Sequence, residues 1–383
     1  MHPPTTTGAG QLSAAAADPA PHVIGPAGRF ASQLLTGPPA KDPVAVVERL
    51  LAVQAQDPRG ARLAIRARSR GLRAEAVNRA LTVDRSLVVT WLNRGTLHLV
   101  RSEDYPWLLA LTTPAQLTGN ARRLGQEGVT PDAAERGVSI VEAELVTHGP
   151  RTRDQLRDRL ASAGVRTEGQ ALVHILALAS FRGLVVRGPV VDGEQAFVTV
   201  RDWLGAPPLP DPVAALAELA RRYLAGHSPA TDRDLAKWAG ISLGQARSAL
   251  AEIGPELEEV AGGVALARDV ARWRRGGRLA EPPPPRLLGA FDPLLHGWVS
   301  RRPILGDDQR LITVNGIFRP FPLVDGRAVG VWSLAGGRVV LRPFGPLANL
   351  AVIALEQDAA DVLRYLDLPK SAEPLVVEAE AGA

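Results

Sequence analysis

Cysteine is absent from the 383-residue chain, and this absence removes several classes of chemistry at once. Without a thiol the chain has no disulfide, no thiolate nucleophile, no cysteine-ligated zinc and no iron–sulfur cluster. The seven histidines are scattered and show no metal-ligand spacing. We therefore expect a protein that uses no metal and no cofactor.

Lysine is almost as scarce, since only Lys41, Lys237 and Lys370 occur. Nearly all other positive charge comes from arginine, and the formal net charge is +4. The planar guanidinium of arginine donates two hydrogen bonds to one phosphate, so this composition is compatible with nucleic-acid binding. The scarcity of lysine limits any Schiff-base chemistry to three positions.

Long apolar runs are also missing. No stretch approaches the ~20 apolar residues that cross a membrane. Residues 1–22 lack the basic region and apolar core of a signal peptide, and we expect them to form a flexible tail. The sequence therefore predicts a cytoplasmic protein without membrane contact, long enough for several small domains.

Residues 42–68 organise the first part of the chain. Apolar residues at three- and four-residue intervals predict an amphipathic helix over 42–57, opened and closed by Asp-Pro pairs. Gln54 and Gln56 stand at its end, where a fraying backbone lets two such side chains converge. Two solvated glutamines at a helix end are the plain alternative. Asp57 is predicted to cap or orient the backbone.

A basic helix and a β pattern follow. Arg59, Arg62 and Arg66 share one predicted helix face. Residues 86–100 then alternate around Asn93-Arg94-Gly95, which predicts a helix end or a strand followed by a strand. His98 lies in this run, where a structural role and a pocket role are both open.

An internal repeat predicts two copies of one module. HGPRTRDQL at 148–156 and HSPATDRDL at 227–235 match at four positions. In each copy an apolar helix precedes the match, Thr152 or Thr231 caps a second helix, and a third helix leads into a hairpin. This order is that of the winged helix, a helix-turn-helix variant that binds nucleic acid. Modules used only for protein contacts are the alternative.

Beyond the proline run at 282–285 the pattern turns to short alternating strands with Asp-Gly and Gly-Gly turns. The predicted fold class is α+β, with tandem winged-helix modules followed by a small C-terminal β-barrel-like domain, for which the strand pattern leaves a small barrel or a curled sheet open. The predicted divisions are a tail at 1–22, winged-helix domains at 23–125, 126–206 and 207–281, and a β domain with a closing helix at 282–383.

Several blocks occur in a characteristic order: LLAVQAQDPRGARLAIRAR, TWLNRGTLHLVRSEDYPWLLAL, LLGAFDPLLHGWVSR and GRAVGVW. This order resembles the winged-helix DNA glycosylase family of AlkZ and YcaQ. In the AlkZ-like branch a Gln-aliphatic-Gln motif is catalytic, whereas in the YcaQ branch aspartate replaces the second glutamine. The resemblance implies that Gln54 and Gln56 are catalytic. From the same blocks we take Arg59, Arg94 and His98 as candidate DNA or pocket contacts.

The two glutamines restrict the chemistry. Glycosidic bonds break through a transition state that resembles an oxocarbenium ion. A glutamine amide does not titrate, so it can only position water through its carbonyl oxygen and hold sugar or base through its NH₂. Such help suffices when the leaving base is already cationic. We therefore expect N7-alkylated purines as substrates, with Gln54 and Gln56 positioning the attacking water beside C1′.

The resemblance also implies a biological setting. The AlkZ-like branch excises bulky alkylpurines and unhooks interstrand cross-links made by antibiotics, which protects the producer. The expected partner is double-stranded DNA that contains alkylated purines, bound in the nucleoid by a monomer. Because no lysine lies in the resembling blocks, we expect a monofunctional enzyme without lyase activity.

Two alternatives belong to other functional classes. A winged-helix transcription regulator binds DNA without chemistry, and tandem helix-turn-helix units alone favour it. Against it stand the glutamine pair outside the repeats and the fused β domain. A peptide- or ligand-binding scaffold needs an uncharged binding face, and the arginines of the first domain argue against that.

Overall fold

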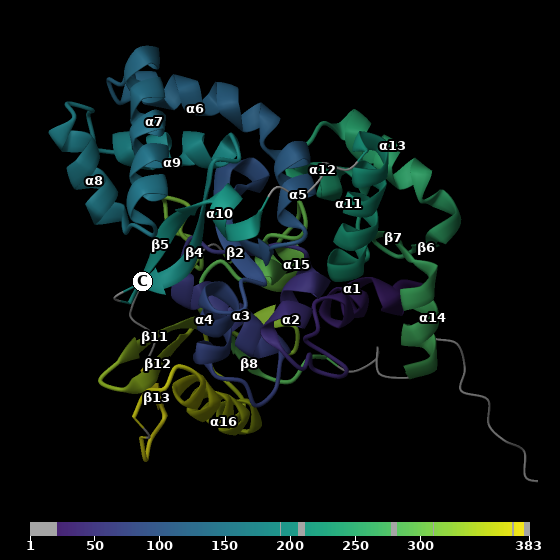
Figure 1. Cartoon of the computed structure of the whole chain (residues 1–383). Helices are drawn as coiled ribbons and strands as arrows, with labels where there is room; N and C mark the ends of the chain where they lie inside the picture. The colour runs from purple at the N-terminus through teal and green to yellow at the C-terminus, as the bar shows by residue number, and fades with distance from the viewer. Residues whose placement is uncertain are drawn as a thin grey trace, which may run out of the picture.

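The computed structural model describes residues 21–191, 193–205, 211–276, 282–308, 310–369 and 371–378. The predicted tail at 1–22 lies outside the described residues, except that its last two residues already belong to the first helix. The chain has a mixed α+β structure in which three largely helical units, each with a β-hairpin, precede a β-rich C-terminal segment (Figure 1). Among the residues described, no helix combines the length and apolar character that crossing a bilayer requires.

The first unit covers residues 21–126 and contains the glutamine motif. Its elements are α1 (Pro21–Ser32), α2 (Pro43–Leu50), β1 (Val53–Gln54), α3 (Pro58–Arg68), α4 (Ala74–Thr82), β2 (Leu87–Leu92), the 3-10 turn η1 (Asn93–Gly95), β3 (Thr96–Arg101), α5 (Tyr105–Thr112) and α6 (Pro114–Gln126). Strand β1 pairs with β3, and β3 pairs with β2. The second of the two predictions for residues 86–100, strand followed by strand, is therefore confirmed.

Helix α2 ends earlier than the sequence predicts. Leu51 adopts φ 63° and ψ −49°, and the Ala52 N–H donates to the Leu50 carbonyl oxygen at 2.7 Å. This is the pattern of a γ-turn, which is rare and strained for a residue with a side chain. The helical interpretation of 42–57 is therefore wrong in its second half, and Gln54 and Gln56 do not lie at a helix end. The apolar spacing misled because residues 51–53 and 55 are buried in and around the short strand β1 and not along a helix.

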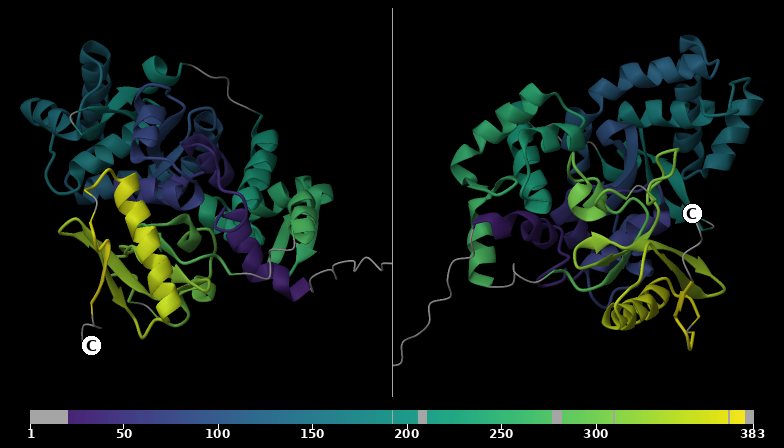
Figure 2. Two further views of the ribbon diagram at one scale, coloured as in Figure 1. Left: turned by 90° about the horizontal axis from the view of Figure 1, so that it is seen from below. Right: turned by 180° about the vertical axis from the view of Figure 1, so that it is seen from behind.

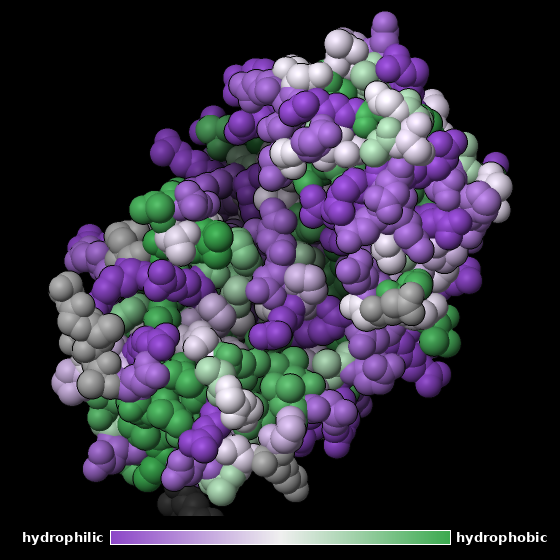
Figure 3. Space-filling model, turned by 90° about the vertical axis from the view of Figure 1, so that its left-hand side faces the viewer, coloured by the Kyte–Doolittle hydropathy of each residue, from purple (hydrophilic) through white to green (hydrophobic). Residues whose placement is uncertain are grey.

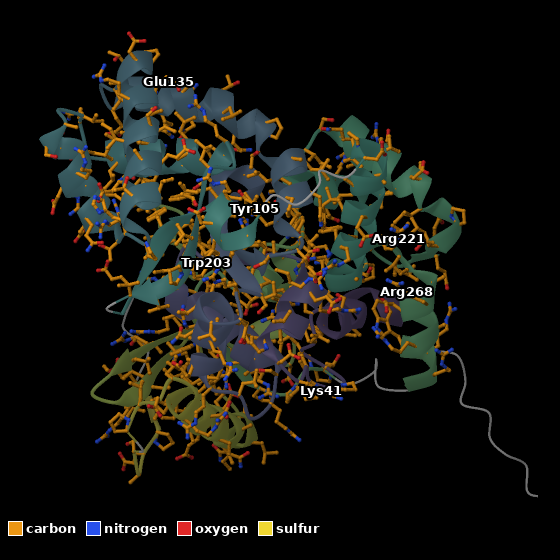
Figure 4. The ribbon with its side chains drawn as sticks, in the orientation of Figure 1. Lys41, Tyr105, Glu135, Trp203, Arg221 and Arg268 are labelled. Carbon is orange, nitrogen blue, oxygen red and sulfur yellow. The ribbon has the colours of Figure 1, made fainter. Side chains whose placement is uncertain are left out.

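The second unit covers residues 131–204 and shares its sheet with the first. Its elements are α7 (Pro131–His148), α8 (Arg153–Ser162), α9 (Ala171–Phe181), β4 (Val185–Val191), β5 (Glu194–Thr199) and α10 (Val200–Leu204). Pairing of Val89 with Arg187 joins the hairpins into one sheet of order β1-β3-β2-β4-β5. Trp203 lies between the units with Arg85 stacked over its ring at 4.0 Å (Figure 4).

The third unit repeats the order of the second. Its elements are α11 (Pro212–His227), α12 (Asp232–Ala239), α13 (Leu243–Glu252), the 3-10 turn η2 (Gly254–Glu256), β6 (Leu257–Val260), β7 (Gly263–Leu266) and α14 (Ala267–Gly276). Thr152 and Thr231 cap the second helix of their repeats, each in a capping box. Three helices followed by a hairpin are thus present in both repeats, as predicted. Helix α1 lies beside the third unit (Figure 2).

The C-terminal segment contains two open sheets. Its elements are β8 (Arg286–Leu288), η3 (Pro293–Leu295), α15 (Arg302–Leu305), β9 (Phe321–Val324), β10 (Arg327–Ala328), β11 (Gly330–Ala335), β12 (Arg338–Pro343), α16 (Asn349–Tyr365) and β13 (Leu375–Val377). The sheet orders are β10-β9-β8 and β11-β12-β13, and the described residues form no closed barrel. The barrel-like prediction is therefore wrong. Pro322 and Pro343 lie within the strands and lack the N–H that further pairing needs.

The turns and the closing helix of this segment follow the sequence more closely. Asp325-Gly326 and Gly336-Gly337 connect strand pairs with positive φ at both residues, as predicted. Helix α16 packs against β8, β12 and β13. On the face shown in Figure 3, apolar side chains gather in the lower half, where Figure 1 places β11–β13 and α16, below a hollow lined by hydrophilic residues.

Three of the four arginines of helix α3 bond to other groups of the protein. Arg66 forms a bidentate pair with Asp358 at 2.8 and 2.9 Å, and Arg68 forms one with Asp292 at 2.7 and 2.9 Å. Arg62 donates to the Asn78 side chain and the Pro58 carbonyl oxygen. Carboxylates distant in sequence therefore neutralise Arg66 and Arg68, whereas Arg62 bonds to uncharged groups and Arg59 stays exposed.

We expect Arg68→Ala to lower the free energy of unfolding by about 3–5 kcal/mol, because it leaves the Asp292 carboxylate buried without its counter-charge. Arg73→Ala is the matched control, since it removes an exposed guanidinium paired with Asp367, at a cost below about 1 kcal/mol. Denaturant unfolding measures both variants. Equal losses would contradict the role of Arg68 as a buried anchor.

Candidate active site

Gln54 is the end of strand β1 and faces a row of polar side chains. It lies opposite His98 of β3, which lies opposite Thr90 of β2. Because successive strand residues point to opposite faces, these three side chains share the face of Val88 and Val100. That face packs toward the third unit and residues 288–323. The row is thus enclosed between parts of the chain that are distant in sequence.

The two glutamines differ in their surroundings. The side chain of Gln54 is 7% exposed, whereas Gln56 follows the end of the strand and is exposed. Within the described ranges, neither side-chain amide has a hydrogen-bond partner. The amide of Gln54 is not among the buried polar atoms that lack a partner, so it still reaches solvent although the residue as a whole is nearly buried. The amide of Gln54 is therefore available to a ligand or to water.

His98 is a neutral imidazole with a defined tautomer. Its Nδ1 lies 2.9 Å from the Thr96 carbonyl oxygen, which can only accept, so Nδ1 carries the proton and Nε2 is left as an acceptor. Burial, and to a smaller extent the charge of Arg94, lowers the pKa of His98 to about 3. The Oγ1 atom of Thr90, which is fully buried, also lacks a partner in the described structure. The row therefore presents three unmet hydrogen-bonding groups.

A loop of the C-terminal segment adds aromatic and basic groups. His296 packs against Phe318 with ring centroids 4.4 Å apart and against Phe291 at 6.1 Å. Arg301 lies over Phe318 at 4.9 Å. Burial lowers the pKa of His296 well below its ordinary value, and the charges of Arg94 and Arg301 act in the same direction. This loop therefore faces the same site as the hairpin β2–β3.

An open groove of about 960 Å³ runs between this hairpin and the second unit. Gln56 lies in its wall, together with Trp91, which stacks on Phe197 at 6.2 Å. No carboxylate is among the lining residues that the structure describes, whereas five arginines are: Arg94, Arg122, Arg123, Arg153 and Arg187. Burial is the largest cause that lowers the pKa of Arg187, to about 10, followed by the charge of Arg153. The groove is therefore strongly basic.

The structure brings some of the predicted site residues together. Gln54 and His98 are direct cross-strand neighbours, and Gln56 and Arg94 line the same groove. Arg59 is exposed in the first turn of α3 and lines neither the row nor the groove. Asp57 caps this helix by accepting from the Gly60 N–H at 2.7 Å, as predicted.

Sequence reasoning missed Thr90, His296, Arg301 and Arg187. The block LLGAFDPLLHGWVSR, which already carried the resemblance, contains His296 and Arg301 and was the available signal for them. Thr90 and Arg187 carried no local signal, because their place depends on strand register and on the pairing of β2 with β4.

A family model described as DNA glycosylase AlkZ-like matches residues 47–365. The chain belongs to the AlkZ-like DNA glycosylase family. An interstrand DNA cross-link repair glycosylase from Streptomyces sahachiroi is 31% identical over 351 residues, which cover 86% of this chain and 91% of that relative. The solved structure of the Streptomyces sahachiroi DNA glycosylase AlkZ matches with a TM-score of 0.73 and 28% identity, covering 94% of this chain and 98% of AlkZ.

Among the described residues of this AlkZ-like chain, the titratable side chains are not arranged for metal binding. In the part of the chain that the structure describes, no three His, Asp or Glu side chains cluster in a way that could hold an ion. The buried histidines are instead surrounded by cations and aromatic rings. Their arrangement favours neutral hydrogen-bonding roles.

The depressed pKa of His98 predicts a loss of stability in acid. Between pH 3 and 6.5 the unfolded chain holds a proton that folded His98 does not, so stability falls as pH falls through this window. We expect about 2 kcal/mol of this loss per such histidine between about pH 7.5 and about pH 5. His227 shares the window, because its pKa is also lowered to about 3.

The measurement is denaturant unfolding at stepped pH. The His98→Asn variant should lose less stability on acidification than the wild type by this amount. His148→Asn, which changes an exposed histidine of α7, is the matched control. Parallel pH profiles for wild type and His98→Asn would show that His98 is not buried in its neutral form.

Proposed function

We propose that the protein is a monofunctional DNA glycosylase that hydrolyses the N-glycosidic bond of N7-alkylated purines. The observation that carries the proposal is the unpaired amide of Gln54, held in register with neutral His98, in a member of the AlkZ-like family. Gln54 and Gln56 are the proposed catalytic residues. His98 and Arg94 are proposed pocket contacts, and Arg59 is a proposed DNA contact on the exposed start of α3.

The proposed reaction uses the substrate's own positive charge. Alkylation at N7 makes the purine a cationic leaving group, so the base takes the electron pair of the glycosidic bond and departs neutral. The sugar passes through an oxocarbenium-like state, water adds at C1′, and a proton is lost to solvent. The carbonyl oxygen of a glutamine accepts a hydrogen bond from this water, and its NH₂ group holds an oxygen of sugar or base. Neutral His98 supplies a further acceptor.

We further propose bulky adducts and interstrand cross-links as substrates. The groove beside Gln56 lies at the upper end of the ~300–1,000 Å³ range of small-molecule pockets, far beyond the needs of one base. The similar protein of Streptomyces sahachiroi is described as an interstrand DNA cross-link repair glycosylase. The corresponding biological role is resistance to a genotoxic natural product.

The proposed path of the DNA follows the basic groove. Its five arginines can neutralise phosphates, which supply most of the affinity of proteins for DNA. We propose that the repeated units, over 126–206 and 207–281, are winged-helix domains, and that the first, over 23–125, is a third. With the segment at 282–383 they act as one monomer in the nucleoid. A regulator without chemistry is not favoured, because it leaves the unpaired amide of Gln54 without a role.

Single-turnover release of N7-alkylguanine from a duplex tests the catalytic role. We expect Gln54→Ala and Gln56→Ala each to lower the rate about hundredfold or more, because each removes a group that positions water. Gln357→Ala on α16 is the matched control, since its side chain is exposed and distant from the motif in sequence. DNA binding is measured in parallel.

Two outcomes would count against the proposal. Release by the wild type no faster than the spontaneous rate, on both a small and a bulky adduct, would exclude glycosylase activity on these lesions. Full activity in the double variant Gln54→Ala/Gln56→Ala would support the glycosylase activity but contradict the catalytic role of the two glutamines.

The absence of lyase activity is tested separately. After base release we expect the abasic strand to stay intact, and sodium borohydride to trap no protein–DNA adduct. The reason is that a Schiff base needs an amine, and the two described lysines lie outside the glutamine motif, Lys41 in the loop before α2 and Lys237 on α12. Trapping that disappears in Lys237→Arg would contradict the proposal and identify the amine.

A further inference from the structure

Two guanidinium groups face the same space at the candidate site without a counter-charge. Arg94 uses its Nη1 to donate to the carbonyl oxygens of Lys237, at 3.2 Å, and Trp238. Arg301 uses its Nε to donate to the Leu295 carbonyl oxygen at 2.8 Å. Burial, and then the charge of Arg301, lowers the pKa of Arg94, and no carboxylate pairs with either arginine within the described part of the chain. The remaining nitrogens of both groups have no partner among the residues described.

A third polar group is enclosed beside them. The imidazole of His296 packs against Phe318 and Phe291, and its Nε2 is buried without a hydrogen-bond partner in the residues described. Arg301 lies over the same Phe318 ring at 4.9 Å, and both Arg94 and this loop are attached to α12, because Arg94 donates to the Trp238 carbonyl oxygen and the Val299 N–H donates to Asp234 Oδ1 at 2.7 Å. Burial, and then the charges of Arg94 and Arg301, lower the pKa of the His296 ring. We call the space between these three groups the notch. An unpaired buried nitrogen costs free energy unless a ligand completes its hydrogen bonds.

The backbone on both sides of the notch is strained. Arg94 has φ 59° at the hairpin turn, and Phe291 has φ 56° in the aromatic loop. Left-handed conformations of residues with side chains are unfavourable and persist where surrounding structure enforces them. Buried Asp292 enforces the loop, because it pairs with Arg68 and caps the turn at Leu294. The notch is therefore held in place rather than formed by mobile side chains.

We propose that Arg94, His296 and Arg301 clamp one phosphate of the DNA backbone next to the damaged nucleotide. This role rests on the proposed glycosylase function. Two forked cations and a neutral N–H donor match an anion that offers several oxygens, and phosphate is the anion that DNA supplies. Arg301 is kept in position by its stacking on Phe318.

In the proposed clamp, the β2–β3 hairpin and the C-terminal loop bind the same phosphate. Arg94 lies on the turn that connects β2 to β3, and His98 of β3 lies opposite Gln54. A phosphate fixed by this turn holds the adjoining deoxyribose at a set distance from the glutamine. Arg94, His296 and Arg301 are therefore positioning residues, and their loss should weaken both DNA binding and base release.

A thermodynamic cycle between protein and DNA tests the clamp. The probe is a duplex with one tetrahydrofuran abasic site, in which a single linkage within two nucleotides of that site is a neutral methylphosphonate. We expect one such linkage to weaken wild-type binding about tenfold. Arg301→Ala should weaken binding to the unmodified duplex by a similar factor and show no further loss with the neutral linkage. Arg94→Ala should behave in the same way.

Arg302→Ala is the matched control, because Arg302 is exposed and pairs with Asp307 at 3.2 Å. It should keep the full sensitivity to the neutral linkage. If, at every linkage tested, the loss of binding from the neutral linkage multiplies the loss from the arginine substitution in both variants, the clamp is overturned. Because the abasic probe has no base to release, binding without coupling overturns only the clamp. Coupling without base release by the wild type overturns only the proposed glycosylase function. Thermal unfolding of each variant, with Arg301→Lys as a milder change, excludes misfolding as the cause.

Discussion

The buried ion pair between Arg68 and Asp292 sets the geometry on which the site depends. Both side chains are fully excluded from solvent, and Arg68 also donates to Gln33 at 2.9 Å. Arg68 ends the helix that begins just after Gln56, whereas Asp292 begins the turn that leads to His296. A pair of this kind adds little net stability, but its two hydrogen bonds fix orientation. The loop from Asp292 to His296 and strand β1, which carries Gln54, are thereby held at a fixed distance from each other.

The γ-turn at Leu51 places the two glutamines in different surroundings. Had α2 continued, Gln54 and Gln56 would point about 200° apart on one helix. The turn instead ends the helix, so that Gln54 enters a strand and faces His98, while Gln56 follows the strand and reaches the groove. One amide is nearly buried and the other is open to solvent. The motif therefore spans the boundary between an enclosed polar row and the basic groove.

Local features of the sequence were sufficient to predict much of the fold. Thr152, Thr231 and the Asp-Gly and Gly-Gly turns act through neighbouring backbone, so their patterns can be read directly. The end of α2 could not be predicted, because buried strand residues imitate helical spacing there. The partners of Arg66 and Arg68 could not be predicted, since their carboxylates lie more than two hundred residues later. The closed barrel failed for the same reason, as strand partners are set by tertiary contacts.

The scarcity of acids at the site has a chemical consequence. A carboxylate beside C1′ would stabilise positive charge on the sugar and assist the loss of any base, damaged or intact. The row and the groove offer amides, a neutral histidine and arginines instead. Arginines oppose positive charge on the sugar unless phosphates neutralise them, so the site gives little help to an ordinary purine. Under the proposed function, selectivity then rests on the lesion itself, because only a base that already carries a positive charge departs with such modest assistance.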